Sequence, residues 1–155
     1  MKPLILLIIV FAISAVVSQF ATGNWHLIFN GNLAMCLMLC FTALGHFKFT
    51  KGMTMMLPGF IPLKMELVYF TGIAEIVLGL ALLFPSLRYT AGLILIVLFL
   101  LILPANIHAA IKHINYETAA YDGKDINYLW IRVPMQVLFI LWVLYFSVKN
   151  QVNVC

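Results

Sequence analysis

The chain is organised into five long apolar stretches that are separated by short polar connections or connections marked by Gly and Pro. A hydrocarbon core about 30 Å thick needs roughly 20 residues of apolar helix to cross it. The predicted helices run approximately over residues 4–20, 27–47, 65–87, 89–111 and 126–148. We therefore predict an all-α integral membrane helical bundle with five transmembrane helices, in which residues 1–155 form a single transmembrane domain.

The first apolar stretch has a second interpretation. Lys2, the apolar run and the small residues Ala21 and Gly23 are also typical of a signal peptide that is cleaved after Gly23. We expect a retained helix. Removal of residues 1–23 would leave four spans with the same orientation.

The composition fits this architecture and excludes several functional classes. The chain is 65% hydrophobic and 9% charged, whereas a soluble domain is roughly half apolar and about a quarter charged. A separate soluble catalytic domain is therefore excluded, and the lipid bilayer is the main surrounding partner. The net charge of +4 comes from single Lys and Arg residues at the ends of apolar segments, so no nucleic acid partner is expected.

The distribution of Lys and Arg predicts an orientation, because short loops rich in these residues tend to stay in the cytoplasm. One side of a five-span bundle carries Lys2, Lys48, Lys51, Lys64, Lys112, Lys124 and Arg132, and the other carries Arg88 and Lys149. This asymmetry predicts a cytoplasmic N-terminus and an outside C-terminus with Cys155, in the cytoplasmic membrane of a bacterium.

The connection from Lys48 to Lys64 is unusually apolar for a solvated loop. Pro58 and Pro62 prevent it from continuing as one helix. We expect it to lie in the membrane interface or to fold back over the bundle, as an anchored interfacial segment or as a functional lid. Its apolar residues are Met53, Met55, Met56, Leu57, Phe60 and Ile61.

Glu75 is the most unusual residue inside a predicted span. It lies about ten residues into the segment, which at 1.5 Å per residue is roughly 15 Å deep. An ionisable side chain at this depth costs about 2.5 to 3.5 kcal/mol on insertion scales, so it nearly always faces the bundle interior. Thr71, Gly72 and Gly79 recur with it at helical spacing and predict a small, polar face where another helix packs closely.

Polar residues on three other helices are predicted to reach similar depth, since the spans alternate in direction. Thr42 and His46 share one helical face, a kink at Pro104 would turn the residues after it inward, and a third stripe recurs every four residues on the last helix. The predicted cluster consists of His46, Glu75, Asn106, Arg132 and Gln136, with Thr42, His108 and Tyr128 around it.

Two interpretations of this cluster stay open at the level of sequence. Glu75 and Arg132 could neutralise each other and fix helix register with Asn106 and Gln136, or the cluster could bind a ligand. We expect no metal site, because one histidine and one carboxylate are too few ligands. Cys36 and Cys40 match neither a redox nor a zinc motif, and we interpret them as packing residues.

Fragments at the predicted helix ends resemble the DoxX family of small integral membrane proteins. They lie at residues 43–47, 58–62, 71–76, 103–106 and 129–136. The resemblance implies a four-helix core, to which this chain adds an N-terminal helix. The family takes its name from a subunit of an archaeal thiosulfate:quinone oxidoreductase, so the resemblance also implies a redox-associated role.

The sequence therefore favours a redox-associated membrane subunit whose cluster binds a quinone head group or a small sulfur-containing acid. Arg132, His46 and Asn106 would contact the ligand, and Glu75 would receive a proton; no residue is assigned as catalytic. The chain has no CxxC pair and no haem, flavin or iron–sulfur motif, so a bound quinone or a redox partner protein would carry electrons. The alternative is a non-catalytic membrane scaffold or assembly factor that binds other membrane proteins.

Overall fold

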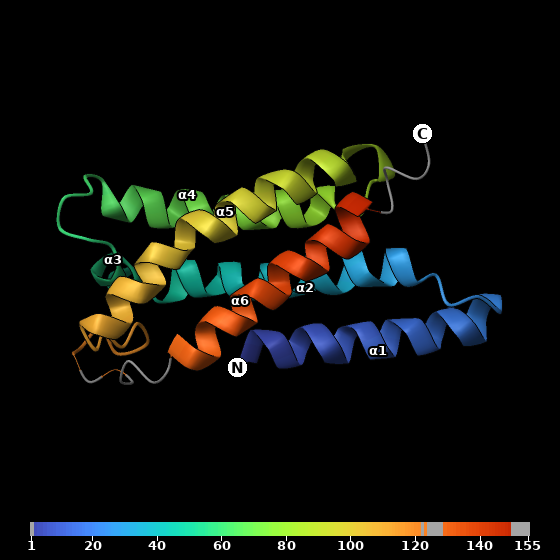
Figure 1. The fold of residues 1–155 in the computed structure, drawn as a ribbon, viewed down its shortest axis with the longest axis horizontal. Helices are drawn as coiled ribbons and strands as arrows, with labels where there is room; N and C mark the ends of the chain where they lie inside the picture. The colour runs from blue at the N-terminus through green and yellow to red at the C-terminus, as the bar shows by residue number, and fades with distance from the viewer. Residues whose placement is uncertain (1, 122, 124–128, 150–155) are drawn as a thin grey trace.

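Four helical segments of the protein are long and apolar enough to cross a membrane. The computed structural model describes residues 2–121, 123 and 129–149. The four segments are α1 (Lys2–Thr22), α2 (Leu27–Lys48), α5 (Pro85–Ile111) and Leu129–Lys149, in which α6 (Leu129–Val143) continues into the π-helix η2 (Leu144–Lys149). In Figure 1 they lie side by side as a bundle. The predicted all-α class is confirmed for the described residues, which contain no strand.

One of the five predicted spans, the third along the chain, is not confirmed as a membrane-spanning helix. It corresponds to α4 (Lys64–Ala81), which has 18 residues and carries Lys64, Glu66 and Glu75. These three charged residues separate α4 from the four strongly apolar segments. Even so, α4 is part of the bundle, because α2 packs more extensively against α4 than against any other element.

The predicted boundary between the third and fourth spans is wrong. The prediction continued one helix to residue 87, whereas α4 ends at Ala81 and α5 begins at Pro85. Proline fits the first position of a helix, where its missing N–H is not needed. The turn between the two helices consists of Leu82, Leu83 and Phe84, so hydropathy gives no sign of it.

Arg88 stabilises this turn. Arg88 was counted among the charged residues at the ends of the predicted spans. In the structure its side chain is buried, with 6% exposure. Nε donates to the carbonyl oxygen of Leu82 at 2.9 Å, and Nη2 donates to that of Leu83 at 3.4 Å. The guanidinium thus satisfies carbonyl groups that the end of α4 leaves without helical donors.

The main hydrophobic core lies between α1, α2, α5 and α6, and includes Leu7, Met38, Leu39, Leu95 and Val143. Aromatic side chains join α1 to the last helix. The rings of Phe11 and Trp142 meet edge to face at 5.1 Å between centroids, a favourable arrangement for aromatic pairs.

A buried polar cluster fixes the transition from α6 into η2. Asn32 is fully buried on α2. Its amide donates to the carbonyl oxygen of Phe146 at 3.1 Å, and its oxygen accepts from the Ser147 hydroxyl at 2.6 Å. Because a π-helix alters the regular ladder of backbone hydrogen bonds, we interpret this cluster as structural.

One end of the bundle is covered by a cap, which we define as residues 49–63 and 109–121. It contains α3 (Thr50–Met56), the only helix within the 49–63 segment. Met56, Ala109 and Ile114 form a small hydrophobic core of their own. Figure 1 shows α3 beside the end of α2 and the C-terminal end of α5. The apolar connection therefore folds back over the bundle, which is one of the two predicted arrangements. It contains a helix that was not predicted, and this helix ends before Pro58.

Candidate functional site

A cavity of about 500 Å³ lies beneath the cap, between α2, α4, α5 and α6. All five residues of the predicted cluster line it. Most of its remaining wall is apolar, including Met38, Phe99 and Phe139. The polar lining residues are Thr42, His46, Thr71, Glu75, Asn106, Tyr116, Arg132 and Gln136.

The helix directions bring these residues together. The C-terminal ends of α2 and α5 and the N-terminal ends of α4 and α6 all lie at the capped end (Figure 1). α5 continues through Pro104 as helix, and Figure 1 shows its C-terminal part turning away from the direction of its first half. Asn106, just after this proline, lines the cavity. The predicted convergence of four helices is therefore found.

Glu75 and His46 form the charged centre of the cavity. Glu75 Oε1 lies 3.5 Å from His46 Nε2, and both side chains are largely buried. The Thr42 hydroxyl donates to Glu75 Oε2 at 2.8 Å. Of the two interpretations left open, direct neutralisation of Glu75 by Arg132 is not found, because Glu75 pairs with His46.

His46 contacts polar groups through both ring nitrogens. Nδ1 lies 3.0 Å from the carbonyl oxygen of Val68 and 3.2 Å from the Thr71 hydroxyl, and Nε2 faces Glu75 Oε1. Either ring nitrogen of an imidazole can carry a proton, so the ring is placed to exchange a proton with the carboxylate.

Gly72 lets α2 and α4 approach closely enough to form this pair. An added Cβ on Gly72 would lie 2.8 Å from Cβ of His46, which is closer than side chains pack. One turn beyond Glu75, an added Cβ on Gly79 would contact Cys36 at 3.5 Å. The small face predicted around Glu75 is thus the contact surface for α2.

Replacing Gly72 with alanine is expected to lower stability, although alanine is the better helix former by about 1 kcal/mol. The methyl group would push His46 away from Glu75, and such overpacking costs roughly 1 to 3 kcal/mol. A lower melting temperature of the detergent-purified protein would report the net loss. Gly45→Ala is the matched control, since its Cβ would meet only the flexible end of Met53 at 3.4 Å. Equal melting temperatures for the two variants would contradict this packing role.

Asn106 and Gln136 form a second polar group across the cavity. The Asn106 amide donates to Gln136 Oε1 at 3.2 Å. Gln136 Nε2 in turn donates to the backbone carbonyl of Phe99. Pro104 has no backbone N–H, so the carbonyl of Leu100, the residue after Phe99, lacks its usual helical donor. This pair joins α5 to α6 near the bend in α5.

Arg132 lies at the capped end of the cavity. Its guanidinium carbon is 5.7 Å from the centre of the Tyr116 ring, within the range of a cation–π contact. Sequence reasoning missed Tyr116, because it lies in the segment between two predicted helices and carries no helical spacing. Met56 and Leu57 of the cap were likewise not predicted as cavity residues.

The three residues predicted around the cluster have different outcomes, and Thr42 lines the cavity. His108 lies on α5 and does not line the cavity: its Nδ1 lies 2.9 Å from the carbonyl oxygen of Met56 in the cap. Tyr128 lies outside the described residues. Among the described residues, no three His, Cys, Asp or Glu side chains gather into a group that could hold a metal ion.

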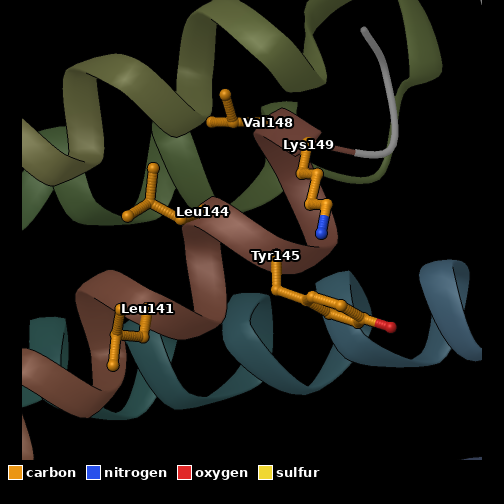
Figure 2. Close-up of a pocket in the computed structure, with 5 residues that line it drawn as sticks. All are labelled: Leu141, Leu144, Tyr145, Val148 and Lys149. Carbon is orange, nitrogen blue, oxygen red and sulfur yellow. The ribbon is translucent and has the colours of Figure 1, made fainter. Parts of the chain in front are cut away.

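A second pocket lies on α6 and η2, shown with its lining residues in Figure 2. It is formed by Leu141, Leu144, Tyr145, Val148 and Lys149. It contains none of the predicted cluster, and its wall comes from one continuous helical segment. We therefore regard the capped cavity as the candidate functional site.

No curated protein and no solved structure matches the chain in sequence or structure comparisons. The resemblance to the DoxX family therefore stays a prediction. One family does match: a domain of unknown function, DUF8561, over residues 35–147. This range runs from α2 into η2 and contains all five residues of the predicted cluster. Since the match extends over well more than half of the chain, the protein belongs to the DUF8561 family.

Proposed function

We propose that the protein is a redox-associated, DoxX-like membrane subunit that binds a small ligand in the capped cavity, with a quinone head group as the best-fitting chemistry. The observation that carries this proposal is the close contact of His46 with Glu75, together with hydrogen-bond donors, inside an otherwise apolar cavity. Ligand pockets in proteins are mostly apolar, with a few polar groups that orient the ligand.

The lining residues suit a ring that carries two carbonyl oxygens. Arg132 and Asn106 supply donors on α6 and α5, and His46 lies across the cavity on α2. The volume of about 500 Å³ falls within the usual range of about 300 to 1,000 Å³ for small-molecule sites.

Proton exchange is the chemical role we propose for this chain. Reduction of a quinone to a quinol takes up two electrons and two protons. We propose that the His46–Glu75 pair supplies one of these protons directly and that the second proton comes from the aqueous phase, which also returns a proton to the pair. The electrons would come from a partner protein, because the sequence has no motif for an electron-carrying cofactor.

The proposal includes five spans, with α4 as the fifth. Lys64 and Glu66 lie in the first turn of α4, where they can reach the membrane interface. Glu75 is buried against α2 and would not contact lipid. With the Lys and Arg asymmetry, this arrangement gives a cytoplasmic N-terminus and an outside C-terminus in a bacterial cytoplasmic membrane, and puts the cavity in the cytoplasmic half.

The test is to purify the full chain in its native lipids and to analyse extracted lipids for quinone. Arg132→Met is expected to lower ligand affinity about tenfold or more, because hydrogen bonds to charged groups contribute roughly 1.5 to 3 kcal/mol. A ligand-dependent rise in melting temperature measures the affinity. Lys149→Met is the matched control, since it removes a cation from the pocket of Figure 2 and not from the cavity.

Two results would argue against this function. The first is wild-type protein that contains no quinone and shows no change in melting temperature with added quinone. The second is a partner protein that co-purifies equally with wild type and with the double variant Glu75→Gln and Arg132→Met. That result would favour the scaffold or assembly factor, in which the cluster only stabilises the fold.

A further inference from the structure

Three residues of the cavity wall are exposed on the outer surface of the bundle. They are Leu67 and Phe70 of α4 and Leu101 of α5, with exposed fractions of 37%, 66% and 70%. Every other lining residue is buried or half-buried. The exposed part of the described cavity wall therefore belongs to α4 and α5.

The arrangement of α4 and α5 explains why this part of the cavity wall is exposed. The helices are joined by the tight turn at residues 82–84 and separate toward the capped end (Figure 1). Leu67 and Phe70 are three residues apart and so share one face of α4. They lie on the separated part of α4, and Leu101 lies on α5 where that helix approaches its bend. The exposed wall residues of both helices are apolar.

The cap, in contrast, is held together by contacts between its two parts. An added Cβ on Gly52 would overlap the backbone carbonyl of Tyr116, so the two parts of the cap are in direct contact. Lys64 Nζ donates to the carbonyl oxygen of Leu57 at 3.1 Å, and His108 binds the carbonyl of Met56. These bonds hold the chain on both sides of its turn after α3.

We propose that the ligand enters and leaves sideways, between α4 and α5, and is an amphiphile from the lipid whose long apolar tail passes between Phe70 and Leu101. This inference rests on the proposed function and narrows it. Of the two ligands that the sequence favoured, it selects the quinone with an isoprenoid tail. A small sulfur-containing acid would arrive from water at the capped end, and carrying its charge through an apolar, lipid-facing gap is costly.

The experiment measures quinone exchange with the full chain in phosphatidylcholine vesicles. Deuterated long-tailed quinone in donor vesicles replaces bound quinone, and rapid affinity capture with mass spectrometry gives the rate. Leu101→Trp is expected to slow this exchange roughly tenfold, because the gap must then open further for each passage. Leu100→Trp is the matched control: Leu100 is also exposed on α5 but does not line the cavity.

A second variant gives a result of opposite sign. Phe70→Ala removes the larger side chain from the gap and is expected to speed exchange severalfold, which keeps the inference testable if Leu101→Trp fails to fold. Ile73→Ala, on the exposed surface of α4 away from the cavity, should leave the rate unchanged.

A water-soluble quinone without a tail serves as the probe of the head-group site. It should occupy wild type and Leu101→Trp equally at equilibrium. If this probe binds but neither gap variant changes the exchange rate of the long-tailed quinone, the lateral route is wrong and the proposed function survives. If neither quinone binds the wild type, the proposed function itself fails.

Discussion

A Gly52→Ala variant is expected to lose about 3 kcal/mol of folding stability, the upper part of the range for overpacked sites. Its methyl group would overlap the backbone carbonyl of Tyr116. Backbone atoms cannot rotate away as a side chain can, so α3 must separate from residues 113–116. Alanine would otherwise favour α3 by about 1 kcal/mol through helix propensity, and this gain is too small to offset the clash.

Thermal unfolding and limited trypsin digestion together measure this effect. A loss of this size in a protein of 155 residues corresponds to a melting temperature lower by roughly 10 °C. Cleavage at Lys51 should also become faster, because separation of the cap exposes its backbone. Gly59→Ala is the matched control within the same segment, since an added Cβ there meets nothing within 4 Å. If both variants melted and were cleaved like wild type, the cap would not depend on this contact.

The sequence predicted the helices well because membrane spans have a strong and simple signal. Their apolar lengths follow from the thickness of the bilayer, and four of them meet that criterion in the structure. The break at Leu82, Leu83 and Phe84 was missed because the turn is as apolar as the helices beside it. Hydropathy records the environment of a residue, whereas this turn depends on Pro85 and on the capping bonds of Arg88.

The seven residues of α3 were missed as a helix for a different reason. A segment this short has too few turns to show helical periodicity, and an isolated helix of this length is unstable in water. Its stability comes from packing against Ala109 and Ile114, which are more than fifty residues away in sequence. Only the end of α3, set by Pro58, could be predicted locally.

The cluster could be predicted, but its pairing could not. Spacing along each helix gives the residues that share a face, and the direction of each helix gives their depth. Which residue faces which depends on the rotation of neighbouring helices about their axes. Gly72 brings α2 against α4 and so selects His46 as the partner of Glu75, whereas Arg132 lies beside Tyr116 of the cap.

Glu75→Leu is expected to abolish ligand binding while leaving the protein at least as stable as wild type. On insertion scales, replacing an acidic residue with leucine at mid-membrane gains about 3 kcal/mol. The loss of partners for Thr42 and the His46 ring costs roughly 1 to 3 kcal/mol. The two effects nearly cancel, as is common when buried ion pairs are replaced by apolar residues. Leucine cannot exchange a proton or accept a hydrogen bond at this position, so quinone affinity should fall more than about tenfold.

Melting temperature and quinone affinity must therefore be measured on the same preparations. Glu75→Gln keeps an acceptor for Thr42 and should lie between wild type and Glu75→Leu in affinity. Glu66→Gln is the control for loss of a carboxylate, because Glu66 is exposed in the first turn of α4 and does not line the cavity. A Glu75→Leu protein that binds quinone normally but melts well below wild type would mean that the pair exists to hold α2 against α4. A stable Glu75→Leu protein that does not bind quinone would mean that Glu75 serves ligand binding. The protein would then carry a carboxylate that is unfavourable inside the membrane although the fold does not need it.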